Sequence, residues 1–207
     1  MIRNQRAGAV LGTIRHNKVG IFMVRAALLL SLAACLAWPA AAEASSPEEA
    51  VVARVLEAAV AGAPSAERVV SRSFNIPAIA AFVLGPYWAP ASRDEQKDFS
   101  ALLTQAIARG LTRRPLASGP DVYTVSGMRR LTNGDAVVLT RVKLARGEVA
   151  NLDWRLRGSP PLVVDVSVDG RSTAVTRRND YQARIRANGG SVRALTTALR
   201  SGAGNDQ

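Results

Sequence analysis

The chain has 207 residues, a hydrophobic content of 48% and a formal net charge of +11 at pH 7. This length suits one domain with a core of its own, and the apolar content is ordinary for a globular protein. A single cysteine excludes a disulfide framework within the chain, so the core alone must hold the domain together.

The first 42 residues have the layout of a secretory signal peptide. Arg25 precedes an apolar run from Ala26 to Ala37, and the small residues Ala40-Ala41-Ala42 follow as a cleavage pattern. The run is about half of the roughly 20 apolar residues that a membrane span needs. We therefore expect export with cleavage near Ala42, which leaves residues 43–207 as a single domain.

Two details of this leader leave alternatives open. Met23 is a conventional start, so residues 1–22 can be an over-long gene start. The sequence Leu32-Ala33-Ala34-Cys35 has the form of a lipobox, which would place a lipidated Cys35 at the mature N-terminus. The apolar run continues past Cys35, where a lipoprotein usually turns polar, and this favours simple cleavage.

Removal of the leader takes away the only cysteine, Cys35, and the only histidine, His16. It also removes five Lys and Arg residues and no acidic residue, so the net charge falls from +11 to +6. Without His or Cys the mature chain lacks the groups of Ser-His-Asp and Cys-His catalysis and the usual ligands of zinc, copper and haem. We predict no enzymatic activity, no metal and no cofactor; a hydrolase using Asp153 or Asp165 stays as an alternative.

The first half of the mature chain reads as helices that carry apolar residues at helical spacing. A short basic segment with Val69 and Val70 is expected between the first and second helices. Capping residues mark the three helix starts and Gly or Pro marks their ends: Ser46, Asn75 and Ser92 at the starts, and Gly62, Gly85 and Pro115 at the ends.

The second half alternates apolar and polar residues, as strands with one buried face do. The alternating segments are 136–144, 150–157 and 164–168, with a further strand near 123–131. Hairpin signals separate them: Asn133-Gly134, Arg146-Gly147 and Asp169-Gly170. A helical tail from about 177 to 200 follows, and Gly189-Gly190 interrupts it.

This order of elements predicts the α+β class. We expect a curved antiparallel sheet of four or five strands, covered on one face by the N-terminal helices and the C-terminal helical tail. Such an arrangement leaves a pocket between sheet and helices.

Three segments together resemble the MlaC family of periplasmic phospholipid-binding proteins, also called the toluene-tolerance family. Phe74-Asn75-Ile76-Pro77, continued through Phe82 and Leu84-Gly85 to Tyr87-Trp88, is similar to the family's F-D-I-P…A-L-G…Y-W pattern. The segment 164–170 is similar to its strand and turn, and the segment 177–199 is similar to its R-x-x-F…I…G-G…L…L ending. The resemblance covers about residues 46–200.

Two departures from the family pattern concern details of the pocket. Pro160-Pro161-Leu162 stands where an aromatic or basic residue is usual, and residues 109–112 replace a Tyr-containing segment. The hopanoid-cluster branch of the family (HpnM-like proteins) fits the same segments.

The resemblance implies a carrier that takes a phospholipid, or a hopanoid-type lipid, between an inner-membrane ABC transporter complex and an outer-membrane lipoprotein complex. Such a carrier encloses the acyl tails in an apolar cavity, because each exposed CH₂ costs about 0.8 kcal/mol. We expect ten side chains to form the wall, although each can equally be an ordinary core residue: Phe82, Val83, Tyr87, Trp88, Phe99, Leu103, Trp154, Val166, Tyr181 and Ile185.

Arginine pairs at 113–114, 129–130 and 177–178 are candidates for contact with lipid phosphates or an acidic membrane surface, or they form a solvated face. Nucleic-acid binding is a poor interpretation for an exported chain, despite its basic isoelectric point. A protein–protein adaptor with a filled core and no ligand remains the alternative function.

Overall fold

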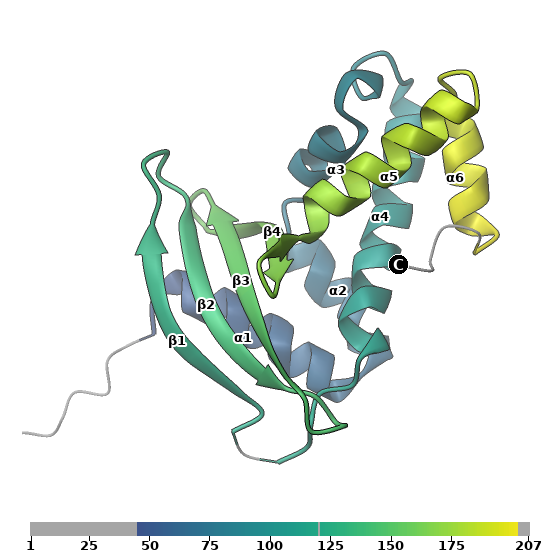
Figure 1. Ribbon diagram of the computed structural model, residues 1–207. Coiled ribbons are helices and arrows are strands. Elements are labelled where there is room, and N and C mark those ends of the chain that lie inside the picture. The colour runs from purple at the N-terminus through teal and green to yellow at the C-terminus, as the bar shows by residue number, and fades with distance from the viewer. Residues whose placement is uncertain (1–44, 120, 203–207) are drawn as a thin grey trace, which may run out of the picture. The chain divides into compact units, whose positions relative to one another are not determined.

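The computed structural model describes residues 45–119 and 121–202, which fold into six α-helices and a five-stranded antiparallel sheet (Figure 1). The helical half contains α1 (Pro47–Ala61), α2 (Ala63–Ser73), α3 (Ile76–Leu84), the short 3₁₀ turn η1 (Gly85–Tyr87) and α4 (Arg93–Arg113). The strands are β1 (Tyr123–Arg130), β2 (Ala136–Lys143), β3 (Val149–Arg157), β4 (Leu162–Val168) and β5 (Arg171–Ser172), and α5 (Thr173–Ala187) and α6 (Val192–Arg200) follow. The predicted α+β class is confirmed. The predicted leader, with its alternatives at Met23 and Cys35, lies outside the described residues.

The helix starts follow the predicted capping chemistry. The Ser46 hydroxyl accepts a hydrogen bond from the Glu49 amide at 3.1 Å, and the Ser46 amide donates to the Glu49 carboxylate at 2.9 Å. The same capping box begins α4 at Ser92, and the Asn75 side chain accepts from the Ala78 amide at the start of α3. Each cap satisfies backbone N–H groups that have no partner within the helix.

Helix α2 was not expected from the sequence, and the prediction of a short basic segment there is wrong. Gly62, at φ +90°, ends α1 and leads directly into a second helix, whose first turn contains Pro64. Proline is well accommodated in a first turn. Ala66 and Val70, four residues apart, bury one face of α2 in the core, and Val69 packs beside them, so tertiary packing stabilises this helix.

The strands pair in the order β1-β2-β3-β4-β5, each antiparallel to its neighbour. The three expected turns connect β1 to β2, β2 to β3 and β4 to β5, whereas residues 158–161, which gave no predicted turn, connect β3 to β4. One face of the sheet is buried. On it, Trp154 pairs with Val138 of β2 and Val166 of β4, and its indole N–H donates to the Thr140 hydroxyl at 2.9 Å. The opposite face carries polar side chains such as Arg141 and Arg155, as the alternation predicted, together with the buried Val137.

The predicted helical tail is interrupted where expected. Asn188 ends α5, Gly189 and Gly190 adopt positive φ angles, and the Ser191 hydroxyl caps α6 by accepting from the Ala194 amide. None of the described helices is both long and apolar enough to cross a membrane.

Helices and sheet share one core. In Figure 1, α1 passes behind the sheet, while the other helices gather beyond its β4 side. The core combines the buried face of α1 with α4 and the inner face of the sheet. Its largest fully buried side chains include Trp154, Phe99, Leu56, Leu84 and Leu103.

Candidate functional site

The segments used for the family resemblance meet in space. Phe74 pairs with Val163 of β4 in a parallel bridge, and the Asn75 amide donates to the Val163 carbonyl at 2.9 Å. The junction between α2 and α3 therefore extends the sheet beyond β4. This fixes α3 against the strand that carries the second segment.

The end of α3 is joined in turn to α5. Arg178 donates to the Phe82 carbonyl at 2.9 Å, and Gln182 donates to the Val83 carbonyl at 3.2 Å. These carbonyls belong to the last turn of α3 and have no helical partner of their own. Gly85, at φ +56°, allows this approach, because a Cβ there would lie 2.5 Å from Nε2 of Gln182.

The structure brings nine of the ten predicted wall residues into the shared core. Six are buried: Val83, Phe99, Leu103, Trp154, Tyr181 and Ile185. Three are partly buried and pack against them: Tyr87, Trp88 and Val166. The tenth, Phe82, is exposed on the outer side of α3. Contact of these residues with a lipid stays a prediction.

Tyr181 and Phe99 link α5 to α4 inside this core. Their rings meet edge to face, with centroids 6.0 Å apart and planes at 86°. Burial raises the pKa of the Tyr181 phenol, so this side chain remains neutral and serves as an apolar contact at physiological pH.

An open hollow of about 530 Å³ lies beside the C-terminal end of α1. We call it the end hollow. It is formed by the last turns of α1, the chain before β1 and the first residue of β1: Glu57, Val60, Ala61, Gly119, Asp121, Val122 and Tyr123. Its volume is within the range of about 300–1,000 Å³ that is typical of small-molecule sites.

None of the ten predicted residues lines the end hollow, so sequence reasoning missed it. The only sequence features that could have indicated the end hollow were the predicted end of the first helix at Gly62 and the predicted start of the first strand near Tyr123. Burial, and then the negative charge of Glu57, raise the pKa of the Tyr123 phenol, which therefore stays protonated.

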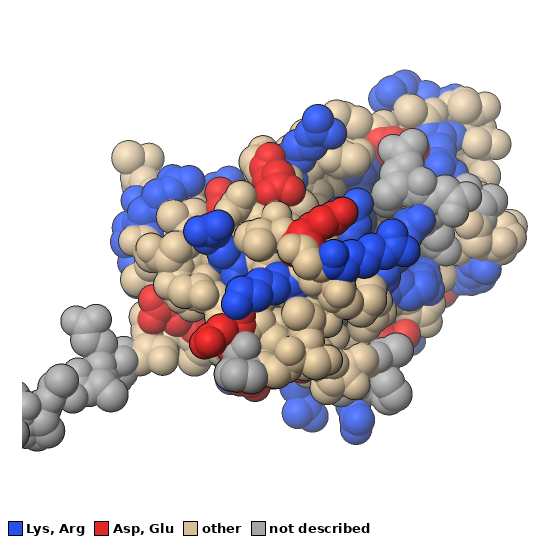
Figure 2. All heavy atoms as spheres, turned by 60° about the horizontal axis from the view of Figure 1, so that its bottom comes forward, with Lys and Arg blue, Asp and Glu red and all other residues tan. Residues whose placement is uncertain are grey.

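Figure 2 turns the molecule so that the bottom of Figure 1 comes forward, and positive and negative side chains are interspersed on this face. The face thus presents no extended field of one sign.

A second, smaller hollow of about 140 Å³ lies between the outer face of the sheet and the helices α3 and α5. We call it the side hollow. It combines apolar and charged side chains: Ala78, Phe82, Arg155, Arg157, Val164, Asp165, Ser172, Ala174 and Val175.

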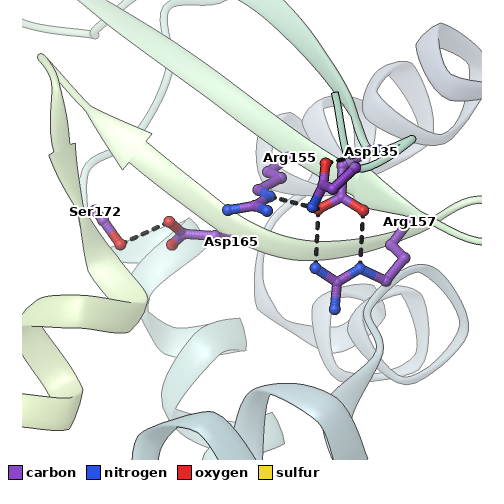
Figure 3. A network of polar contacts seen from close by, with 6 residues as sticks. Asp135, Arg155, Arg157, Asp165 and Ser172 are labelled. Atoms are coloured by element: carbon purple, nitrogen blue, oxygen red, sulfur yellow. Dashed lines mark hydrogen bonds and ion pairs between the residues drawn. The ribbon is translucent and has the colours of Figure 1, made fainter. Parts of the chain in front are cut away.

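A buried carboxylate organises the two arginines of the side hollow (Figure 3). Asp135, whose side chain is 2% exposed, accepts from Nε of Arg155 at 2.6 Å and from Nε and Nη2 of Arg157 at 2.8 and 2.9 Å. Asn133 also donates to it, at 3.1 Å. The hydrogen bond from Arg157 is the main reason why the pKa of Asp135 lies far below its usual value.

The carboxylate of Asp165 is also engaged. It accepts from the Ser172 hydroxyl at 2.6 Å and from the Ala174 amide at 3.0 Å, so it secures the start of α5 to β4. No group of three or more His, Cys, Asp and Glu able to hold a metal occurs within residues 45–119 and 121–202.

The arginine pairs lie in different places. Arg130 forms an ion pair with Glu48 at 2.8 Å, and this pair joins the end of β1 to the start of α1. Arg178 lies over the ring of Phe82, with its guanidinium carbon 4.9 Å from the ring centroid. Among the paired arginines, Arg178 thus contacts a lining residue of the side hollow.

The protein is thus of the α+β class: helices and an antiparallel sheet enclose a common apolar core, and the end hollow lies at its surface. The chain matches the family described as MlaC protein over residues 63–201 and belongs to that family. Among solved structures it is similar to a phospholipid-binding protein from Ralstonia solanacearum, determined in complex with a phospholipid. That likeness has 21% identity and a TM-score of 0.58, and it covers 77% of this chain and 96% of the other. No protein of curated function matches the chain significantly.

Proposed function

We propose that the chain is a periplasmic lipid carrier and not an enzyme. The observation that carries this proposal is the end hollow, which lies where the last turns of α1 meet the chain that leads into β1. Membership of the MlaC family and the shared fold of a phospholipid-binding protein support it.

The energetics favour enclosure of the acyl tails. An acyl chain of about sixteen carbons in water costs on the order of 13 kcal/mol, so a carrier must cover most of its CH₂ groups with protein. The end hollow has the volume to receive part of such a chain. Tyr123, which lines it, also packs against the core cluster that contains Trp154. A tail that enters at Tyr123 therefore reaches the predicted wall residues by separating α1 from the sheet.

The cargo we propose is a phospholipid, with a hopanoid-type lipid as the alternative. The proposed donors and acceptors of this cargo are an inner-membrane ABC transporter complex and an outer-membrane lipoprotein complex. Release of cargo then depends on contact with these complexes, because spontaneous transfer through water carries the cost given above.

Native mass spectrometry of protein purified from the producing cells tests the carrier function. We expect a bound lipid that is released only on denaturation and that lipid extraction identifies. Protein that never carries lipid would contradict the carrier and leave the adaptor with a filled core.

A pair of matched variants tests the position of the lipid path. Val60→Lys places a charge at the end hollow, where it also suits the C-terminal end of α1. Val149→Lys introduces the same change at a similarly exposed valine that does not line the hollow. We expect the lipid-bound fraction to fall several-fold in Val60→Lys only. Equal loading of both variants would show that the lipid enters elsewhere.

A further inference from the structure

Two of the five large apolar side chains that are exposed within the described residues lie together at the side hollow. Phe82 of α3 is 43% exposed and Val175 of α5 is 45% exposed. Ala78, Val164 and Ala174 complete an apolar lining. A clustered apolar surface beside charged groups is more typical of a binding surface than scattered exposed residues are.

The two arginines of this hollow are held in place yet retain hydrogen-bonding capacity. Asp135 engages Nε of Arg155, together with Nε and Nη2 of Arg157. In the described part of the chain, Nη1 and Nη2 of Arg155 and Nη1 of Arg157 donate to no protein acceptor. Their side chains are 40% and 52% exposed, whereas that of Asp135 is 2% exposed. The buried Asp135 therefore holds one edge of each guanidinium group, and solvent reaches the N–H groups on the other edge.

The other charged side chains around the side hollow do not neutralise its arginines. Asp165 uses its oxygens to accept from Ser172 and from the Ala174 amide. Arg178 adds a third guanidinium group, stacked on Phe82 and anchored by its hydrogen bond to the Phe82 carbonyl. Arginine and aromatic side chains on a preorganised surface are typical of residues that dominate binding energy.

The side hollow is separate from the proposed lipid path. Successive side chains of a strand point to opposite faces, so Arg155 and Arg157 lie on the face of β3 opposite to the buried Trp154. The side hollow, at about 140 Å³, has about a quarter of the volume of the end hollow, at about 530 Å³. This smaller space suits one protruding side chain.

We propose that the side hollow is a docking site for an acidic segment of a partner protein, which inserts one apolar side chain between Phe82 and Val175. Carboxylates that flank the inserted side chain pair with Arg155, Arg157 and Arg178. A hollow fits a protruding side chain better than it fits a flat bilayer, and carboxylates match the planar donor pairs of arginine.

The test measures binding of a fluorescent peptide in which one leucine is flanked on both sides by aspartate and glutamate. Peptides with lysine in place of the acidic residues, or alanine in place of leucine, serve as probe controls. Two substitutions at Val175 distinguish the effect of a negative charge from the effect of losing the valine side chain: Val175→Glu and Val175→Lys. Glutamate suits the first turn of α5, so Val175→Glu should fold. Val149→Glu, at a residue 49% exposed outside the hollow, is the matched control.

We expect the acidic peptide to bind the full-length mature protein and to weaken with added salt. Val175→Glu should weaken it about tenfold or more through like-charge repulsion, while Val175→Lys and Val149→Glu retain binding. Equal binding of the lysine peptide, or equal loss in Val149→Glu, would overturn the proposal. A second result would also overturn the proposal: the acidic peptide does not bind, and the protein instead floats with vesicles that contain phosphatidylglycerol. If Val175→Glu abolishes this flotation, the surface recognises a membrane.

The same preparations distinguish this proposal from the carrier function. Val175→Glu should keep the lipid content of the unaltered protein in native mass spectrometry. Loss of lipid in this variant would make the side hollow part of the cargo site and overturn the docking proposal. Absence of lipid from the unaltered protein contradicts the carrier alone.

Discussion

At the scale of single residues, the polar groups that contribute most to the free energy of unfolding are those that water cannot reach. Asp135 is the clearest case, because its carboxylate is buried beneath Arg155 and Arg157. Removing one partner of a buried pair leaves the others unsatisfied, which costs far more than losing an exposed ion pair.

We therefore predict that Asp135→Asn lowers the free energy of unfolding by about 2 kcal/mol, because the half-exposed arginines that lose their partner are still hydrated. Asp180→Asn is the control, because Asp180 forms a partly exposed pair with Arg184 within α5 and should cost less than about 0.5 kcal/mol. Urea denaturation of both variants measures the difference. Equal stability would mean that solvent satisfies Arg155 and Arg157 equally well.

The same carboxylate predicts a dependence of stability on pH. Its pKa is lower in the folded protein than in the unfolded chain, so the unfolded chain binds the proton first as the pH falls. The stabilisation is fully present above about pH 4, the ordinary aspartate pKa, and decreases below it. Urea denaturation between pH 6 and pH 3 should show a steeper acid loss in the unaltered protein than in Asp135→Asn.

Gly85 is a second residue whose importance depends on its neighbour. An alanine there must displace Gln182 from the Val83 carbonyl and adopt a strained positive φ. We predict that Gly85→Ala costs about 2 kcal/mol, and that adding Gln182→Ala then costs almost nothing. Gly134→Ala, with positive φ but open space around it, should cost less. Strict additivity of Gly85→Ala and Gln182→Ala in thermal denaturation would contradict this coupling.

At the scale of elements, local sequence decided most helix starts and strand faces. Capping boxes and alternation act over three or four residues, so they can be recognised without knowledge of the fold. Helix α2 is the exception, because only packing of Ala66 and Val70 against the core stabilises it. Its N-cap, Gly62, provides no side-chain hydrogen bond that could have marked its start.

The cap of α3 gives a prediction at this scale. Asn75→Ala removes the acceptor for the Ala78 amide and should cost about 1 kcal/mol, whereas Asn75→Asp keeps an acceptor and adds a charge favourable to the helix dipole. We therefore expect Asn75→Asp to be at least as stable as the unaltered protein. A loss in Asn75→Asp similar to that in Asn75→Ala would show that Asn75 acts through its amide donors instead.

At the scale of the whole molecule, the proposed lipid binding predicts an effect on stability. A ligand that binds only the folded protein raises its stability by an amount that grows with concentration, about 2.7 kcal/mol at one hundred times Kd. We predict that protein stripped of lipid by organic extraction melts several degrees lower than protein that retains its cargo. Adding back phospholipid should restore the melting temperature. An unchanged melting temperature would contradict a cargo buried in the core.

The sequence by itself determined the α+β class, the family, and the order of the helices and strands apart from α2, because these depend on short-range periodicity, capping and turn residues. It also identified the apolar residues of the core, but not which of them face a ligand. Only the tertiary structure decided the positions of both hollows. The end hollow joins Glu57 with Tyr123, and the side hollow joins Phe82 with Arg155 and Val175. These residues are far apart along the chain, and the physical reason they meet is the packing of α1, α3 and α5 against the sheet, which no local pattern specifies.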